Sequence, residues 1–459
     1  MLTLNFVAAL LIQGEGPLAS AGAPDRPNVV VLMLDTLRPD HLSFFGYSKP
    51  TSPFLDSVAR ESAVFEEARS TTSWTAPACA SLFTGHYPPA HGVLEGFFAH
   101  RRRSDKAEET SPEVLILNQF PEDMKLLPEY FQAEGYRTYC LATNLNIGPE
   151  IGFDRGFDRF VCLDDGTADI VFRELDKWHE EMSSGDQPYF LYLHLMDPHM
   201  PYHPREPLYE RQEDEIADAR SRYDSEILWM DGWLEKIFKR WGWGSETLLV
   251  ALSDHGEEFG EHGQIGHRHS LHVELNKILL LFRGPGIQPA LIPYLGGIHD
   301  VLPTLLDMAG LQPPNEGTGV SLGPLLRGSA SEEQKLAFRD RAVFAHRAKF
   351  RPKTSHLWAA NYKSFRMIQD AGVDLFFDLS RDPFEQLNRV SMLPILSQDV
   401  RAKLWDFRRQ GFGDRSNPVE VELDLDTLSL LDALGYVDSE EDFPPEDLRD
   451  DGESPPEEQ

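Results

Sequence analysis

Asp254 and His255 stand just beyond a run of five apolar residues, Leu248 to Leu252, with only Ser253 between. An unbroken apolar run of this length is typical of a strand buried on both faces of a sheet. In an open α/β sheet, ligands bind just beyond the carboxyl ends of the strands. A carboxylate beside an imidazole at that edge predicts a site for Mn, Zn or Mg, since both groups are good ligands for such ions. The alternative is a polar turn whose Asp caps a helix.

Two further segments extend this pattern. Asp35 follows a second apolar run, Asn28 to Leu34, so it also stands at the end of a predicted strand. Thr75, in the segment SWTAPACASLFTG, is placed to open a helix whose N-terminal amides would face an incoming anion. The spacing of PFLDSVARESAVF predicts another helix over residues 53–65.

The composition limits the class of protein. A chain of 459 residues, 41% hydrophobic and 26% charged, predicts one large α/β domain plus a smaller one. A net charge of −32 argues against nucleic acid or an anionic membrane surface as a partner. The three cysteines match no metal-binding spacing and no disulfide framework. No stretch is long enough to be a transmembrane segment.

The two ends of the chain differ from the rest. Residues 1–24 contain an apolar run, Phe6 to Ile12, and then a region of small residues, which together resemble a secretory signal peptide. The basic region that normally precedes the apolar run of a signal peptide is missing. The apolar run and the small residues alone therefore favour export to the periplasm or out of the cell. Residues 438–459 are acidic and rich in proline, which predicts a disordered, solvated tail.

Three segments together resemble the sulfatase family of the alkaline phosphatase superfamily. They are NVVVLMLDTLRPDHLSFFGY, TTSWTAPACASLFTGHYPPAHGV and LLVALSDHGEEFGEHGQIGH, and the resemblance continues through FDLSRDPFEQLN near the end. The resemblance implies an α/β fold over residues 25–325, with a mixed, largely parallel sheet flanked by helices. It also implies a smaller C-terminal α+β subdomain over residues 326–437, with an antiparallel sheet and a helix. Short strands predicted at residues 342–345 and 374–377 fit such a subdomain.

By the same resemblance, Asp35, Asp254, His255 and Thr75 would bind one divalent metal ion. Two carboxylates and an imidazole hold such an ion while leaving positions open for a nucleophile and a substrate oxygen. The ion could be Mn, Zn, Mg or Ca.

Two histidines and an asparagine complete the implied site. His199 matches the family's substrate-binding histidine, and His267 stands at the place of its second cationic contact. Either could hydrogen-bond the substrate or protonate the leaving group. Asn144 replaces a Lys-x-His pair that contacts sulfate in the family, and could donate a hydrogen bond to a substrate oxygen. Extra imidazoles could recruit a second ion alongside His199 and His267: His194, His262, His269 and His272.

The sequence departs from the family at the nucleophile. Family sulfatases carry C-x-P-x-R or S-x-P-x-R, whose first residue becomes formylglycine, whereas this chain has Thr75 there and Cys79 in place of the Arg. Threonine cannot become an aldehyde, so a covalent adduct on Thr75 would have to be cleaved at sulfur or phosphorus. This route is the ordinary one for phosphoryl groups carried by an activated hydroxyl. Cys79 and Asn144 also stand where the family has cationic side chains that bind sulfate, which weakens the case for a sulfate ester as the substrate.

The sequence therefore predicts a metal-dependent sulfatase-family hydrolase or transferase of sulfate or phosphate esters, with phosphate favoured. Its substrate would be a small-molecule, glycan or lipid ester, and the oligomeric state is left open. Two alternatives remain: a true sulfuric ester hydrolase in which Thr75 only orients a water held by the metal, and an inactive sulfatase-like binding protein.

Overall fold

The structure is a computed structural model that describes residues 26–96, 114–163, 166–349, 354–410 and, with gaps, 412–422. The secretory signal predicted in residues 1–24 and the acidic tail predicted in residues 438–459 lie outside the described residues. Among the helices that are described, none is both long and apolar enough to cross a bilayer.

A sheet of eight strands, ordered β11-β2-β10-β7-β1-β6-β4-β5, forms the centre of the molecule. β10 pairs antiparallel with both of its neighbours, and the other pairings are parallel. The mixed, largely parallel sheet predicted from the sequence is therefore confirmed. Its strands are β1 (Val29–Leu34), β2 (Ala63–Arg69), β4 (Arg137–Ala142), β5 (Arg159–Cys162), β6 (Tyr189–Leu195), β7 (Leu248–Leu252), β10 (Leu280–Arg283) and β11 (Ala290–Gly297).

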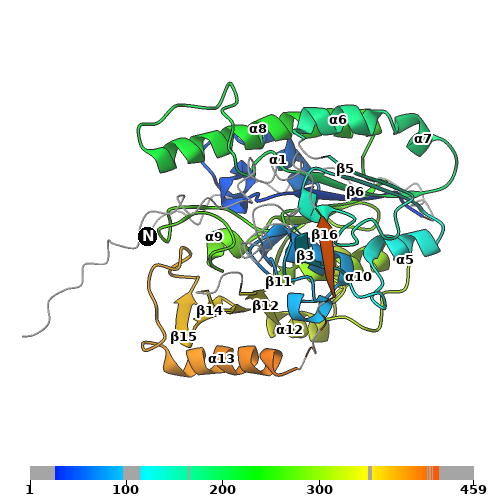
Figure 1. The fold of residues 1–459 in the computed structure, drawn as a ribbon. Coiled ribbons are helices and arrows are strands. Elements are labelled where there is room, and N and C mark those ends of the chain that lie inside the picture. The colour runs from blue at the N-terminus through cyan, green and yellow to red at the C-terminus, as the bar shows by residue number, and fades with distance from the viewer. Residues whose placement is uncertain are drawn as a thin grey trace, which may run out of the picture.

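Helices cover both faces of this sheet (Figure 1). Successive side chains of a strand point to opposite faces, and in β1 Val30 and Leu32 pack on one helical layer while Val31 and Met33 pack on the other. The first layer consists of α1 (Pro53–Arg60), α6 (Ala168–Asp176) and α8 (Glu215–Trp241). The second consists of α2 (Thr75–Thr84), α5 (Leu127–Ala133) and α10 (Val301–Met308). Burial on both sides explains why β1 and β7 are continuous apolar runs.

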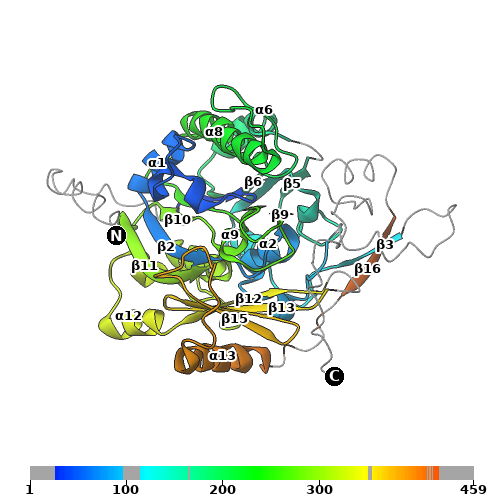
Figure 2. The same ribbon diagram turned by 90° about the vertical axis from the view of Figure 1, so that its left-hand side faces the viewer.

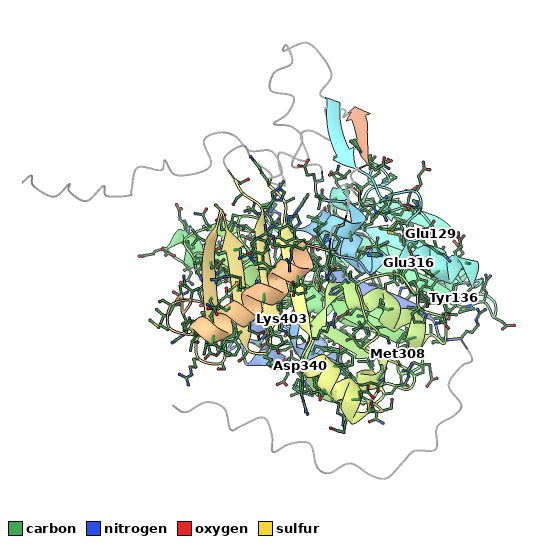
Figure 3. All side chains as sticks on the ribbon, turned by 90° about the horizontal axis from the view of Figure 1, so that it is seen from below. Glu129, Tyr136, Met308, Glu316, Asp340 and Lys403 are labelled. Atoms are coloured by element: carbon green, nitrogen blue, oxygen red, sulfur yellow. The ribbon has the colours of Figure 1, made fainter. Side chains whose placement is uncertain are left out.

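The C-terminal part forms a smaller antiparallel sheet, ordered β12-β13-β14-β15. Its strands are β12 (Ala342–Arg347), β13 (Leu357–Tyr362), β14 (Phe365–Asp370) and β15 (Val373–Asp378). α13 (Pro394–Arg408), which carries Lys403, lies across one face of this sheet (Figure 3). The predicted C-terminal subdomain, with an antiparallel sheet and a helix, is thus present. β3 (Val114–Asn118) and β16 (Pro418–Glu422) pair with each other to one side (Figure 2).

One predicted element is too long. The helix predicted over residues 53–65 ends at Arg60, and Ala63 already belongs to β2. Ala63, Val64 and Phe65 are buried between β10 and β11, so pairing within the sheet overrides a helical spacing that continues through them.

The remaining elements are short, apart from α12. They are η1 (Pro39–His41), η2 (Ser43–Phe45), α3 (Pro88–His91), η3 (Leu145–Ile147), α7 (His179–Ser183), β8 (Glu258–Phe259), β9 (Ile265–Gly266), α9 (Val273–Asn276), η4 (Ile298–Asp300), α11 (Gly323–Leu326) and α12 (Glu332–Arg339).

Candidate active site

Four neighbouring strands, β7, β1, β6 and β4, run parallel and end at the same edge of the large sheet. Asp254 and His255 follow β7, Asp35 follows β1, and Asn144 follows β4 by two residues. His199 lies in the turn after β6. The fold therefore brings these sequence-predicted residues to one place, at the edge where ligands bind in such sheets.

Thr75 reaches this edge from α2, of which it is the first residue. Its side chain is 1% exposed, and its Oγ1 lies 3.3 Å from Nε2 of His255. The amide nitrogen of Asn144 lies 3.4 Å from the same oxygen. The hydroxyl thus lies beside the predicted metal ligands, with the N-terminus of a helix behind it.

The carboxylates of Asp35 and Asp254 fit a divalent cation. Asp35 Oδ1 and Asp254 Oδ2 are buried and have no hydrogen-bond partner among the described residues. They lie 3.8 Å and 3.3 Å from Nε2 of His255, respectively. Buried carboxylate oxygens are normally satisfied, so two such atoms beside an imidazole nitrogen are a candidate ligand set for a divalent cation.

The backbone around these ligands fixes their orientation. Nδ1 of His255 donates to the carbonyl of Gly256 at 2.9 Å, which leaves Nε2 to face the carboxylates. Burial lowers the pKa of His255, which favours the neutral, ligating form. Asp254 Oδ1 accepts from the backbone amides of Thr36 and His255. Thr36 has a φ of 55°, a strained conformation for a β-branched residue that aims its N–H at Asp254.

The two carboxylates also disturb each other's ionisation. Burial and the negative charge of Asp35 raise the pKa of Asp254. Burial alone would also raise the pKa of Asp35, but the hydrogen bond from His194 and the nearby histidines hold it below its usual range. A cation between two buried carboxylates favours the ionised form of both. The electrostatics therefore indicate the same cation site as the two oxygens without hydrogen-bond partners.

His194 contacts a predicted metal ligand, and the sequence did not show this contact. It lies on β6, with Nε2 3.0 Å from Asp35 Oδ2 and Nδ1 2.9 Å from the Tyr192 hydroxyl. Tyr192 in turn contacts the Cys79 sulfur at 3.5 Å. Burial raises the pKa of the Cys79 thiol well above its usual value, which disfavours the reactive thiolate form.

Asn144 contacts two other residues of the candidate site through its side-chain amide nitrogen. Its side-chain oxygen accepts a hydrogen bond from the backbone nitrogen of Asn146, which leaves the side-chain amide nitrogen to face Asp35. That nitrogen donates to Asp35 Oδ2 at 2.7 Å and lies close to Thr75. The observed contacts of Asn144 therefore hold a metal ligand and the hydroxyl in place, while its predicted contact with substrate stays a prediction.

His199 and His267 lie together beside the ligands. Their ring centroids are 5.0 Å apart, and the His267 ring is 4.6 Å from that of His255. His267 Nδ1 donates to Glu257 Oε1 at 3.0 Å, and Glu257 is fully buried. His199 Nδ1 donates to the carbonyl of Met200 at 2.5 Å. Glu257 was missed by sequence reasoning, although an acid two residues beyond His255 is a visible signal.

A second group of metal-type ligands does not include His199 or His267. Within the described residues, the metal-type groups are the Asp35 set and a cluster of Glu258, His262 and Glu274. In that cluster His262 Nδ1 is 2.9 Å from Glu274 Oε1, and this carboxylate helps to raise the pKa of His262 to about 9 against the effect of burial. The cluster is thus already held together by an ion pair. A second ion alongside His199 and His267 stays a prediction.

A cavity of about 550 Å³ lies elsewhere on the molecule. It adjoins the end of α2 opposite to Thr75, roughly 15 Å along a helix of this length. No sequence-predicted site residue lines it. Its lining is Thr84, His86, Ala90, Asp123, Met124, Lys125, Tyr130, Pro314, Asn315, Glu316, Gly317, Thr318, Phe412 and Arg415, of which Glu316 is labelled in Figure 3.

Comparison with known proteins agrees with this geometry. The family model described as Sulfatase matches residues 27–311, which is more than half of the chain. Arylsulfatase K of Xenopus laevis is 32% identical over 201 residues, covering 42% of this chain and 37% of that protein. N-acetylgalactosamine-6-sulfatase of Rattus norvegicus is 24% identical over 449 residues, covering 80% of this chain and 82% of that protein.

Among solved structures, the phosphonate monoester hydrolase of Agrobacterium radiobacter shares the fold. It superposes with a TM-score of 0.68 at 19% identity and covers 87% of this chain and 100% of that one. The family match spans the segments that carry Asp35, Thr75, Asp254 and His255, and the fold agrees over nearly the whole chain. The chain therefore belongs to the sulfatase family of the alkaline phosphatase superfamily.

Proposed function

We propose that this chain is a metal-dependent hydrolase or transferase of phosphate or sulfate esters, with Thr75 as the nucleophile and phosphate esters preferred. The observation that carries the proposal is the position of the Thr75 hydroxyl. It lies 3.3 Å from His255 Nε2, in a buried site that also holds the two unsatisfied carboxylate oxygens. A hydroxyl beside a cation site is the arrangement that turns an ordinary threonine into an attacking group.

Asp35, Asp254 and His255 would hold a divalent ion, with Thr75 as a further ligand. When bound, the ion lowers the pKa of the nearby hydroxyl and offsets negative charge on the transferred group. The chain's own contribution is orientation: the Asn144 amide and the first turn of α2 hold the Thr75 oxygen towards the open edge of the sheet.

The proposed reaction has two steps. In the first, the Thr75 oxygen forms a bond to phosphorus, the hydroxyl proton passes to solvent, and the bond from phosphorus to the organic oxygen breaks. The departing oxygen takes a proton from His199 or His267. In the second, water, or an acceptor hydroxyl in a transferase, attacks phosphorus and gives its proton to the histidine that was deprotonated in the first step; the bond from phosphorus to the Thr75 oxygen breaks, and that oxygen takes a proton from solvent. Sulfate esters would follow the same course with attack at sulfur.

Sulfate esters are the second candidate substrates. Relatives named arylsulfatase K and N-acetylgalactosamine-6-sulfatase favour a sulfated aryl or glycan compound. Against this stands the threonine, since an adduct on threonine cannot be released by collapse to an aldehyde.

A parallel assay decides between the two substrates. Purified protein, stripped of metal and reloaded separately with Mn, Zn, Mg or Ca, is offered an aryl sulfate, a phosphate monoester and a phosphodiester. We expect turnover of a phosphate ester to exceed that of the sulfate. Faster turnover of the sulfate would reverse the proposed preference for phosphate esters. No turnover of any ester with any metal would favour the alternative of an inactive sulfatase-like binding protein.

A further prediction concerns the leaving group. We expect His267→Gln to lower kcat for an alkyl phosphate by about 10²-fold, a typical contribution of general acid catalysis. The same variant should lose much less with 4-nitrophenyl phosphate, because nitrophenolate departs without a proton. Steady-state kinetics with both substrates measure this difference.

His199→Gln is the matched control. Only the histidine that protonates the leaving group should show a loss that depends on the leaving group, while the other should lower kcat for both substrates alike. Equal losses for both substrates in both variants would contradict a role of either histidine as the general acid.

A further inference from the structure

A buried ion pair in the C-terminal subdomain lies behind the active-site segments. Arg366, on β14, and Glu385, after β15, are 2.9 Å apart (Nε to Oε1), and both side chains are 0% exposed. Glu385 has a φ of 56°, in the left-handed region that non-glycine residues rarely adopt. Strain and a fully buried charge pair in one place are costly, which suggests a function beyond packing.

Glu385 holds the segment that follows His267. Its second oxygen, Oε2, lies 2.7 Å from Nδ1 of His272 and 3.1 Å from the backbone nitrogen of Val273. Its carbonyl lies 3.3 Å from Nε2 of His262, whose ring stacks on that of His272 with centroids 3.7 Å apart. Glu385 thus contacts both ends of the segment 262–273, which carries His267 at its middle: its carboxylate contacts His272 and Val273, and its backbone carbonyl contacts His262.

Arg366 connects the same segment to the loop before Thr75. One guanidinium nitrogen donates to the carbonyl of Leu271, and another donates to Asn276 Oδ1 at 2.9 Å. Asn276 ends α9. Its amide nitrogen donates to the carbonyls of Ser70 at 2.8 Å and Thr72 at 3.3 Å.

We infer that the Arg366–Glu385 pair is a positioning device that sets the nucleophile loop, residues 70–75, in register with the segment carrying His267. The two halves of the site come from parts of the chain nearly two hundred residues apart. Through the Leu271 carbonyl and Asn276, one guanidinium holds both. The pair contacts neither substrate nor reacting atoms. The expected effect of the pair on kcat rests on the proposed function, whereas its expected effect on the position of the two segments does not.

The pair remains ionised in the folded protein. Burial lowers the pKa of Arg366 to about 10, which is still well above neutral pH. Burial alone would raise the pKa of Glu385, but Arg366 and His272 hold it below its usual value. Removing one partner therefore leaves an uncompensated buried charge, whereas removing both does not. Removing both partners should therefore restore the stability of the protein, and any loss of kcat that remains would reflect the positions of the catalytic groups.

The test compares Arg366→Met, Glu385→Gln and the double variant with the wild type. We expect the Tm to fall in Arg366→Met and to recover in the double variant. We expect kcat to remain lowered by about 10–100-fold in the double variant, because a small misplacement of catalytic groups is enough to cause such a loss. Binding of the metal by Asp35, Asp254 and His255 should be unchanged, since none of these three residues contacts the pair.

Arg341→Met is the matched control. Arg341 also joins the subdomain to the large domain through a largely buried pair, with each nitrogen 2.6 Å from an oxygen of Asp300. No described contact of this pair reaches residues 70–75 or 262–273. We expect a lowered Tm in this variant with a kcat close to that of the wild type.

Amide hydrogen exchange gives a readout that does not need activity. Exchange should accelerate in residues 70–75 and 262–273 of the double variant and of Glu385→Gln, but not in Arg341→Met. If the double variant regained kcat together with Tm, or if exchange in the two segments matched the wild type, the inference would be overturned. Failure of the wild type to cleave any ester would sink the proposed function alone, since exchange would still decide the inference.

Discussion

Replacing Thr75 by alanine is expected to abolish ester cleavage, with kcat falling by on the order of 10⁴-fold or more, as for other covalent nucleophiles. The hydroxyl lies among Asp35, Asp254 and His255, and no other hydroxyl among the residues described at this site lies within hydrogen-bond distance of His255 Nε2. Steady-state assays measure the loss. Intact-protein mass after rapid quenching should show an added phosphoryl group on the wild type and none on the variant.

Two further variants make this result specific. Thr75→Ser keeps a hydroxyl and should keep much of the activity, while the metal content of both Thr75 variants should stay close to that of the wild type. Cys79→Ala removes the thiol without touching the predicted ligands, so it should remain active. Full activity in Thr75→Ala would instead favour the alternative in which a water, and not the threonine, attacks.

The second large effect concerns the cation. Removing it with a chelator should lower kcat by at least about 10³-fold, and adding the ion back should restore the activity. Asp254→Asn should bind the ion weakly and stay inactive. We also expect the ion to reverse the order of the Tm values of the wild type and Asp254→Asn. In chelator, the variant should have the higher Tm, by roughly 2 °C, because it removes the repulsion between Asp35 and Asp254. With the ion present, the wild type should be the more stable protein.

The measurement is a thermal scan of both proteins with chelator and with each ion, together with metal analysis by mass spectrometry. Glu258→Gln is the control, because it changes the other group of metal-type ligands and leaves the Asp35 site intact. Loss of the activating ion in Glu258→Gln, with retention in Asp254→Asn, would mean that the catalytic ion binds in the Glu258 cluster instead. A metal-free wild type more stable than metal-free Asp254→Asn would contradict the proposed repulsion.

Much of the candidate site could be predicted because its signals are local. Asp35 and Asp254 each follow a buried apolar run, and parallel strands bring their carboxyl ends to one edge. Thr75 opens α2 as expected. The helix predicted over residues 53–65 was too long, because Phe65 continues the apolar spacing of the helix and is equally suited to a buried strand.

Other residues in or beside the candidate site carry no local signal in the sequence. His194 lies within an apolar strand, and only the pairing of β6 with β1 places it beside Asp35. In the sequence, Asn144 indicates only that a cationic pair is absent, yet in the structure its amide donates to Asp35. Arg366 and Glu385 are 19 residues apart in the sequence and roughly a hundred or more from His267, so no spacing indicates that they support it.

The sequence by itself determined which candidate ligands stand at strand ends, and that the residue opening α2 is threonine and not a modifiable cysteine or serine. These are properties of single residues and of their nearest neighbours in the chain. Only the tertiary structure decided which contacts join residues 70–75 to the segment carrying His267, which amide contacts Asp35, and which buried ion pair lies beside these segments. Those contacts join segments that are distant in the chain, and their geometry depends on how the sheet, the helices and the subdomain pack together.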